Sequence, residues 1–215
     1  MRLSLLALAS ILAAGSSPLL ADDIPYANVG QLAPANTLTA SANGTVVGYF
    51  VGSSAGDNDT IALWDVSRGT FSGFVLPNHS STVGAPPTTF LSVGAGDTLV
   101  FILDNVSTGQ YEDSVNDNGI PTTWSADGYN NAYTTAYTGG IAGLPSGLTG
   151  TYVGMEDLAV TGLNPLTGSD LDYNDDTFVF TDIATTSPTP EPASFVLFGT
   201  GLLGAAGILR RKFAR

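Results

Sequence analysis

Short runs of β-favouring residues dominate the chain and constrain its fold more than any other feature. The runs are rich in Val, Ile, Thr and Phe, and clusters of Gly, Asp, Asn, Ser and Pro separate them at intervals of about ten residues. They cover residues 45–52, 60–66, 70–76, 88–93, 98–103 and 177–180. No stretch before Ala193 sustains the apolar periodicity of an amphipathic helix. The sequence therefore predicts an all-β fold, an antiparallel β-sandwich or jelly roll.

The connections between the runs also carry information. Ser67-Arg68-Gly69 separates two runs and is typical of a hairpin loop, with Gly69 free to take a positive φ. Residues 104–150 are rich in Gly, Asn, Ser, Thr and Tyr. Because a structureless loop of this length is uncommon in a compact domain, we expect the segment to hold one or two irregular strands.

The charge balance is strongly acidic. The chain has 19 acidic residues, and only Glu191 lies outside residues 22–189, where Arg68 is the sole cation. Such a surface repels nucleic acid, so no nucleic-acid partner is expected, and it attracts divalent cations. The absence of cysteine means that disulfides do not stabilise the domain. The core, hydrogen bonds and bound ions remain as the sources of stability.

The N-terminus has the pattern of an export signal. Met1-Arg2 is positively charged, residues 3–14 form an apolar run too short to span a bilayer, and small residues follow. We predict a signal peptide over residues 1–21 with cleavage after Ala21, and a second potential cleavage site at residues 14–16.

The C-terminus has the pattern of a single transmembrane helix. Residues 193–209 carry no charge, and the basic end at residues 210–215 supplies the membrane stop Arg210, Arg211 and Lys212. Two prolines flank Glu191 just before the apolar segment and exclude a helical start further upstream. The predicted organisation is a β-domain over 22–183, a flexible linker over 184–189 and the tail over 190–215.

The tail, with Pro190, Glu191 and Pro192 before the apolar segment and the Arg-rich end, resembles the PEP-CTERM sorting signal. The resemblance implies export by a Gram-negative bacterium that makes exopolysaccharide. It also implies processing by an exosortase, a membrane cysteine transpeptidase, with Pro190-Glu191-Pro192 as the recognition site. The protein would be anchored transiently in the inner membrane and then reach the cell surface or extracellular matrix.

An acidic motif follows the predicted strands. Asp170, Asp172 and Asn174 alternate like the first oxygen ligands of many calcium loops, although the glycine and glutamate of an EF-hand are missing. Oxygen ligands without His or Cys favour Ca²⁺ over zinc or copper. The candidate metal ligands are Asp170, Asp172, Asn174, Asp175, Asp176, Glu156 and Asp157. The alternative is a metal-free turn in which the Asp and Asn side chains bind nearby backbone amides.

The same region resembles an exported bacterial domain of unknown function. The matching segments are Gly-Met-Glu-Asp-Leu at 154–158, Asp-Leu-Asp-Tyr-Asn-Asp at 170–175 and Phe-Val-Phe at 178–180, with Ala-Gly-Asp at 95–97. The resemblance implies a β-sandwich and calcium, without an established activity. Where that domain is expected to carry a His, this chain has Asn131.

Other acidic stretches are weaker candidates for cation sites, at residues 57–59 and 113–118. We predict a non-enzymatic component of the extracellular polysaccharide or biofilm matrix, stabilised by calcium. One alternative is a lectin-like module that binds glycan through Tyr129, Tyr133 and Tyr137. The other is a glycan hydrolase using Glu112 and Glu156. His79 is the only histidine, which leaves Ser/His and Cys/His catalysis without support.

Overall fold

The computed structural model describes residues 24–115, 124, 127–160 and 168–186. The predicted signal peptide at 1–21 and the sorting tail at 190–215, with its apolar segment 193–209, lie outside the described residues. Within the described residues, no helix has the length and apolar character needed to cross a membrane. The one helix there is a short 3-10 helix, η1 (Asn78–Ser80).

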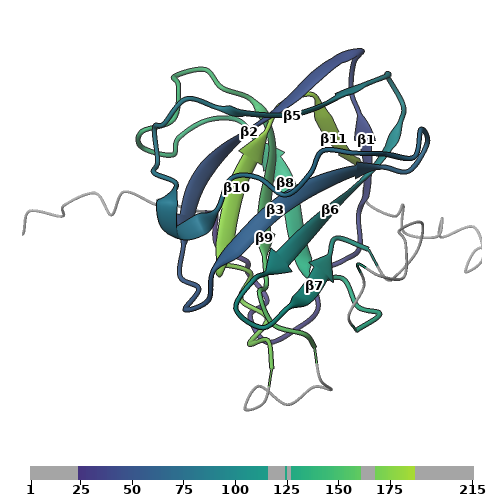
Figure 1. The fold of residues 1–215 in the computed structure, drawn as a ribbon. Helices are drawn as coiled ribbons and strands as arrows, with labels where there is room; N and C mark the ends of the chain where they lie inside the picture. Colours follow the sequence, from purple (N-terminus) through teal and green to yellow (C-terminus); the bar gives the residue numbers. More distant parts are fainter. Residues whose placement is uncertain (1–23, 116–123, 125–126, 161–167, 187–215) are drawn as a thin grey trace, which may run out of the picture.

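Two antiparallel sheets form the domain (Figure 1). The six-stranded sheet has the order β11-β1-β6-β3-β4, with β7 also paired to β6. Its strands are β1 (Thr37–Ala40), β3 (Asp59–Asp65), β4 (Thr70–Phe71), β6 (Thr98–Asn105), β7 (Gln110–Asp113) and β11 (Ile183–Thr186). The five-stranded sheet has the order β5-β2-β10-β9-β8. Its strands are β2 (Gly44–Ser53), β5 (Thr88–Val93), β8 (Ala132–Tyr137), β9 (Gly150–Met155) and β10 (Asp176–Phe180). The predicted all-β fold with antiparallel sheets is confirmed.

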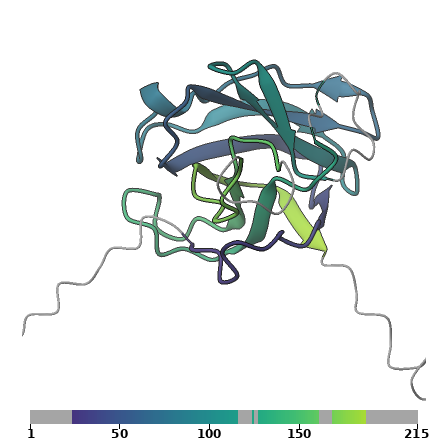
Figure 2. The same cartoon turned by 90° about the horizontal axis from the view of Figure 1, so that it is seen from below.

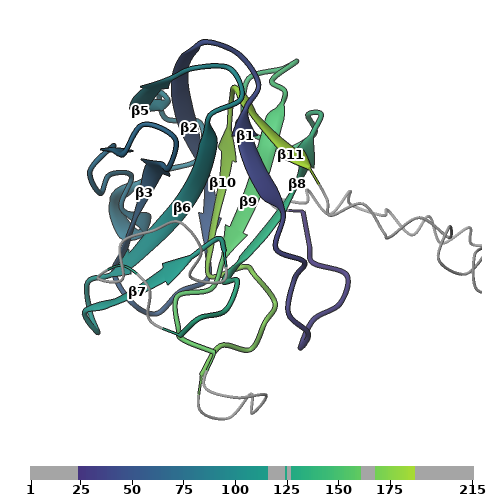
Figure 3. The same cartoon turned by 90° about the vertical axis from the view of Figure 1, so that its right-hand side faces the viewer.

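The main hydrophobic core lies between the two sheets, which are seen as two layers in Figure 3. Alternate residues of each strand point inward, as the two-residue period of a strand requires. Phe101 and Phe180 from opposite sheets meet with ring centroids 4.3 Å apart, and both are fully buried. Ile61 and Leu63 of β3 belong to the same core.

A second cluster covers the outer face of the five-stranded sheet. Tyr137, Tyr152 and Val179 are buried there under residues of the flanking loops, including Ile24 and Ile141. Both faces of the central strands β9 and β10 are therefore buried.

The expected strands agree with the structure within a few residues, with one exception. The run 70–76 forms a strand only as far as Phe71, and Val75 then makes an isolated bridge to Ile61. Gly73, with φ of 78°, interrupts the pairing between them. Two strands, β7 and β8, lie within residues 104–150, as expected. The predicted hairpin loop is present, and Gly69 has φ of 64°.

The C-terminal boundary of the domain differs from the prediction. Residues 184–186, expected to begin the linker, belong to β11, which pairs with β1 from Thr37↔Thr186 to Ala40↔Ile183. The first and last strands therefore lie side by side at one edge of the six-stranded sheet.

The inward faces of three strands become polar at the same end of the sandwich. In β3 the apolar inward series that includes Ile61 begins at Asp59, and in β10 the series that includes Phe178 begins at Asp176. In β6 the inward series ends at Asn105, which pairs with Asp59. This end, the lower one in Figure 1, faces the viewer in Figure 2.

Candidate metal centre

Glu156 directly follows β9 and organises the acidic motif. Its carboxylate accepts hydrogen bonds from the backbone N–H groups of Leu171, at 3.1 Å, and Tyr173, and from the Ser169 hydroxyl. The residue is fully buried. Burial raises the pKa of Glu156 to about 7, although the hydrogen bonds from Ser169 and Tyr173 oppose this shift. Glu156 thus anchors the loop that carries the remaining acidic residues.

The backbone of this loop has an unusual conformation. Leu171 has φ of 58° and Tyr173 has φ of 57°, which is sparsely populated for non-glycine residues. Both side chains are buried in a cluster with Tyr26, and the Tyr173 hydroxyl accepts a hydrogen bond from the Ala33 N–H at 2.8 Å. Packing and the Glu156 carboxylate together hold this conformation, as such backbone positions require.

Asp170 and Asp172 lie beside Glu156. One carboxylate oxygen from each of the three residues lies within 4.8 Å of the others. Asp170 is exposed and Asp172 is half-buried, so the group opens to solvent. We call these three residues the loop site. Its oxygen-only chemistry suits a hard cation such as Ca²⁺.

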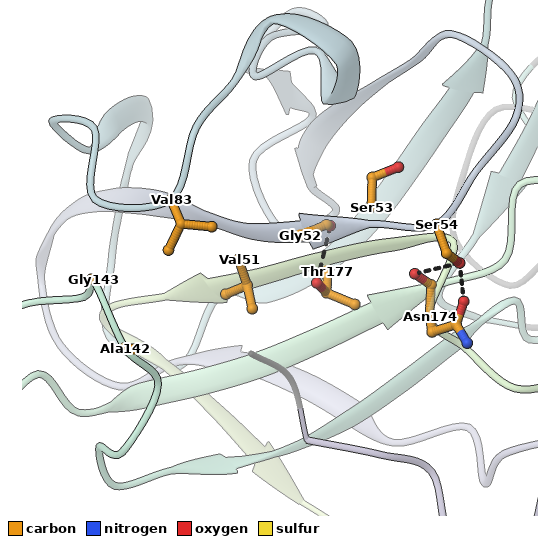
Figure 4. Close-up of a pocket in the computed structure, with 9 residues that line it drawn as sticks. All are labelled: Val51, Gly52, Ser53, Ser54, Val83, Ala142, Gly143, Asn174 and Thr177. Carbon is orange, nitrogen blue, oxygen red and sulfur yellow. Dashed lines mark hydrogen bonds between the residues drawn. The ribbon is translucent and has the colours of Figure 1, made fainter. Parts of the chain in front are cut away.

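Asn174 donates its side-chain Nδ2 to Asp172 Oδ2 of this group, while its oxygens face Ser54. Its backbone N–H binds Asp172 Oδ1 at 3.1 Å, whereas its side-chain and backbone oxygens accept hydrogen bonds from the Ser54 hydroxyl (Figure 4). Asn174 lines a cavity of about 680 Å³ beside the ends of β2 and β10, together with Ser53 and Thr177. Part of the acidic motif therefore does form the Asx-type turn that was the alternative to a metal site.

The remaining predicted ligands lie on the inner side of the motif. Asp157 donates its backbone N–H to Asp175 Oδ2 at 3.2 Å, and the carboxyl groups of these two residues are in contact. Asp176 points between the sheets, where its carboxyl group faces that of Asp59. Six of the seven predicted ligands thus divide between the loop site and an inner group at the polar end of the sandwich, and Asn174 lies beside the loop site, bonded to Asp172 and Ser54.

Burial and mutual repulsion act on every carboxyl group of the inner group. Desolvation is the main cause that raises the pKa values of Asp59, Asp157, Asp175 and Asp176. Charges of neighbouring aspartates act in the same direction. Each group is therefore held in an environment that favours a bound proton or a cation.

Asp57 also belongs to this region. With Asp157, Asp170 and Asp175 it lines a cavity of about 380 Å³ that separates the loop site from the inner group. Its stretch, residues 57–59, was a weaker candidate in the sequence.

A separate buried carboxyl group lies on β7. Glu112 is fully buried, and its Oε2 accepts a hydrogen bond from Asn131 Nδ2 at 2.7 Å. Asn131 also donates to Asp127, whose Oδ2 accepts the Val160 N–H at 2.6 Å. Burial, together with the charge of Asp127, raises the pKa of Glu112 to about 9. Neither Glu112 nor Glu156, the two candidate hydrolase residues, presents its carboxyl group to solvent.

The tyrosines expected to contact glycan have structural roles. Tyr137 is buried in the outer cluster, and Tyr133 packs against Tyr26 with ring centroids 5.0 Å apart. Only Tyr129, with 40% of its surface exposed, lies open to solvent. The alternative of a glycan-contacting surface therefore loses Tyr137, which the covering loops bury, while Tyr133 is half-buried in packing against Tyr26.

Another aromatic group was not identified from the sequence. Trp64, Phe71, Phe74, Tyr111 and Trp124 form a continuous, half-buried cluster on the outer face of the six-stranded sheet. Phe71 and Trp124 stack with centroids 4.3 Å apart. The residues come from β3, β4, β7 and the adjoining loops, so their proximity depends on strand pairing that single runs of sequence do not reveal.

Two asparagines of the inner group were also missed. Asn78 Nδ2 binds Asp59 Oδ2 at 2.9 Å, and Asn105 Nδ2 binds Asp57 Oδ2 at 2.9 Å. A signal was present for Asn105, because it continues the alternating inward series Leu99, Phe101 and Leu103. Asn78 follows no such pattern.

Comparison with known proteins identifies one region of the chain. Residues 188–212 match the model of the PEP-CTERM protein-sorting motif. No curated protein and no solved structure matches the chain. The motif implies export and membrane-anchored sorting in Gram-negative bacteria, with processing by an exosortase. The match does not extend into the β-sandwich.

Proposed function

We propose that the protein is an exported, non-enzymatic component of the extracellular polysaccharide or biofilm matrix, whose β-sandwich is stabilised by calcium. The sorting motif at residues 188–212 supports export and carries this proposal. The loop site supports calcium, because three carboxylates converge there. Their mutual repulsion amounts to about 1 kcal/mol per pair at 4 Å in water, and more where water is excluded.

The sorting part is tested in a Gram-negative host that contains an exosortase. The unchanged chain should be processed and appear in the matrix fraction. Replacement of Pro190, Glu191 and Pro192 by alanine should leave a full-length chain in the inner-membrane fraction. Retention of the unchanged chain in the membrane would contradict release into the matrix.

The calcium part is tested with Asp172→Asn. The new amide can still accept the hydrogen bond from Asn174 N–H, but it gives up the second acceptor that now binds Asn174 Nδ2 and removes one negative charge from the loop site. Calcium titration calorimetry on the full chain should show a site of about 10⁻⁴ to 10⁻³ M that the substitution weakens at least tenfold. Asp104→Asn, on the outer face of β6, is the matched control. Equal calcium binding by Asp172→Asn and the unchanged chain would exclude the loop site.

Glycan binding is the second candidate function, and the outer aromatic cluster favours it. Half-buried aromatic rings offer flat apolar faces with little conformational entropy to lose. The acidic surroundings favour a neutral glycan. Trp124→Ala should abolish retention on a neutral polysaccharide column, whereas Tyr129→Ala should leave it unchanged. Retention that survives Trp124→Ala would exclude this surface.

A further inference from the structure

Two carboxyl groups from opposite sheets meet inside the sandwich. Asp59 of β3 is 1% exposed and Asp176 of β10 is 0% exposed, and their carboxyl groups face each other at the polar end of the core. Both residues occupy inward positions in their strands, which the strand registers fix. The pairing is thus part of the fold and not an accident of two mobile side chains.

Three oxygens of this pair have no donor in good hydrogen-bond geometry, although the nearby Ser53 hydroxyl lowers the pKa of Asp176. They are Asp59 Oδ1 and both carboxylate oxygens of Asp176. Two ionised carboxylates cannot satisfy each other, because both are acceptors only. A buried charge without compensation costs several kcal/mol, so this arrangement requires added positive charge.

In the described part of the chain, no lysine or arginine reaches this pair, and the charge of His79 lowers the pKa of Asp59 only as the last of several causes. Arg68, the one basic residue there apart from His79, binds Asp97 with Nε–Oδ2 at 2.7 Å and lies beside Asp65, at the other end of β3. The ring nitrogens of His79 contact Asn58 Oδ1, at 3.0 Å, and the Ala55 carbonyl oxygen. More negative charge is close by instead, from Asp57, Asp157 and Asp175.

Amide groups hold the carboxyl groups in place and leave oxygens free. Asn78 accepts the Asp59 backbone N–H at 3.1 Å and donates to Asp59 Oδ2, so that Oδ1 faces Asp176. Asn105 donates to Asp57 Oδ2 and to the Asp157 carbonyl oxygen, both at 2.9 Å. Hydrogen bonds of this kind orient the ligands of metal sites.

We propose that Asp59 and Asp176 bind a divalent cation of the calcium type between the two sheets. Asp157 and Asp175 place further negative charge around the pair and also line the 380 Å³ cavity. Water would complete the oxygen-only coordination sphere of the ion. This interior site is distinct from the loop site, since it shares none of its three carboxylates. An ion at the interior site would join the two sheets directly, whereas an ion at the loop site would hold only the loop that connects β9 and β10.

The test counts calcium ions. Equilibrium dialysis measures the number of calcium ions bound per molecule. The unchanged full chain should bind one ion more than the Asp176→Asn variant. The substitution keeps the shape of the side chain and gives Asp59 Oδ1 an amide donor, so the variant should fold and unfold at a higher temperature than the unchanged chain in chelator. Asp59→Asn should lose the same ion. Asp104→Asn, a neighbour of the site that faces outward, should lose none.

The outcomes separate this site from the loop site. Asp172→Asn should lose only the loop ion, and Asp176→Asn only the interior ion, so either site can fail while the other stands. If Asp176→Asn and Asp59→Asn bind as much calcium as the unchanged chain, the pair holds a shared proton and the interior site is excluded.

Discussion

At the scale of single residues, Glu156 joins the fold to the acidic motif. One buried side chain satisfies two backbone N–H groups and one hydroxyl, and it also supplies an oxygen to the loop site. The main role of Glu156 is structural, because the left-handed backbone at Leu171 and Tyr173 depends on these hydrogen bonds. A metal ion at the loop site would therefore stabilise a conformation that Glu156 already sets.

Replacing Glu156 with alanine should lower the free energy of unfolding by about 3 kcal/mol or more. Each buried donor left without an acceptor costs about 1–3 kcal/mol. Tyr173 N–H and the Ser169 hydroxyl lose their acceptor, whereas Leu171 N–H keeps only its bond to Ser169 Oγ. Urea unfolding measures the change. Glu156→Gln keeps one acceptor oxygen and should cost less. Equal stability of Glu156→Ala and the unchanged chain would show that the loop is held by other contacts.

Glu112 should make stability depend on pH. Its folded pKa of about 9 lies above the ordinary value of 4.5, mainly because it is buried. Between these pH values the folded state holds a proton that the unfolded state has released, so the free energy of unfolding falls as pH rises. The stabilisation is complete below the ordinary value and is lost as pH rises through about 9.

Glu112→Gln should make this decline shallower, because an amide stays neutral and still offers an oxygen to Asn131 Nδ2. Urea unfolding at several pH values from about 5 to 9, in the presence of chelator, checks the slope. The same slope in the variant and the unchanged chain would mean that Glu112 is ionised in the folded protein.

At the scale of elements, β9 must approach the acidic loop without a side chain at Gly154. A Cβ there would collide with the Tyr173 carbonyl oxygen. Gly154→Ala should therefore destabilise the protein by about 1–3 kcal/mol, as overpacking does. Gly44→Ala on β2, where the nearest heavy atom lies 4.0 Å away, should change stability by less than about 0.5 kcal/mol. Thermal unfolding of both variants tests this prediction. Equal melting temperatures would contradict the close approach of β9 to the acidic loop at Gly154.

The strands were predictable because their signals are local. Composition and turn residues placed β2, β3, β5, β6 and β10 within two residues of their observed bounds. The strand expected at 70–76 was mostly wrong because Gly73 breaks the pairing after two residues. The β-propensity of the individual residues does not reveal such a local change in backbone conformation.

The candidate site was predictable only in part, for a related reason. The proximity of Glu156, Asp170 and Asp172 follows from one connection between neighbouring strands. The pairing of Asp59 with Asp176 depends on the stacking of two sheets, over a long separation in sequence. The inward alternation could have placed each of them in the core, but not opposite the other.

At the scale of the whole molecule, charge is distributed unevenly. The chain has a net charge of −13, and carboxyl groups of several elements gather at one end of the sandwich. Monovalent salt screens exposed charges over about 8–10 Å but has little effect on buried ones. Divalent cations bound at that end would relieve the repulsion, and an exported protein meets them in its surroundings. The sorting motif implies export, and the proposed cation binding at the acidic end fits surroundings that contain divalent cations.

Thermal unfolding of the full chain in calcium, in magnesium and in chelator, at equal ionic strength, tests the central claim most directly. A site of about 10⁻⁴ M contributes about 1.4 kcal/mol at millimolar calcium, which corresponds to a rise of roughly 3–5 °C in melting temperature. Magnesium should give less, because it demands octahedral geometry and dehydrates reluctantly. The account predicts a rise specific to calcium that is diminished in both Asp172→Asn and Asp176→Asn. Identical melting temperatures in calcium and chelator would contradict it and leave the acidic end as a protonated, metal-free part of the fold.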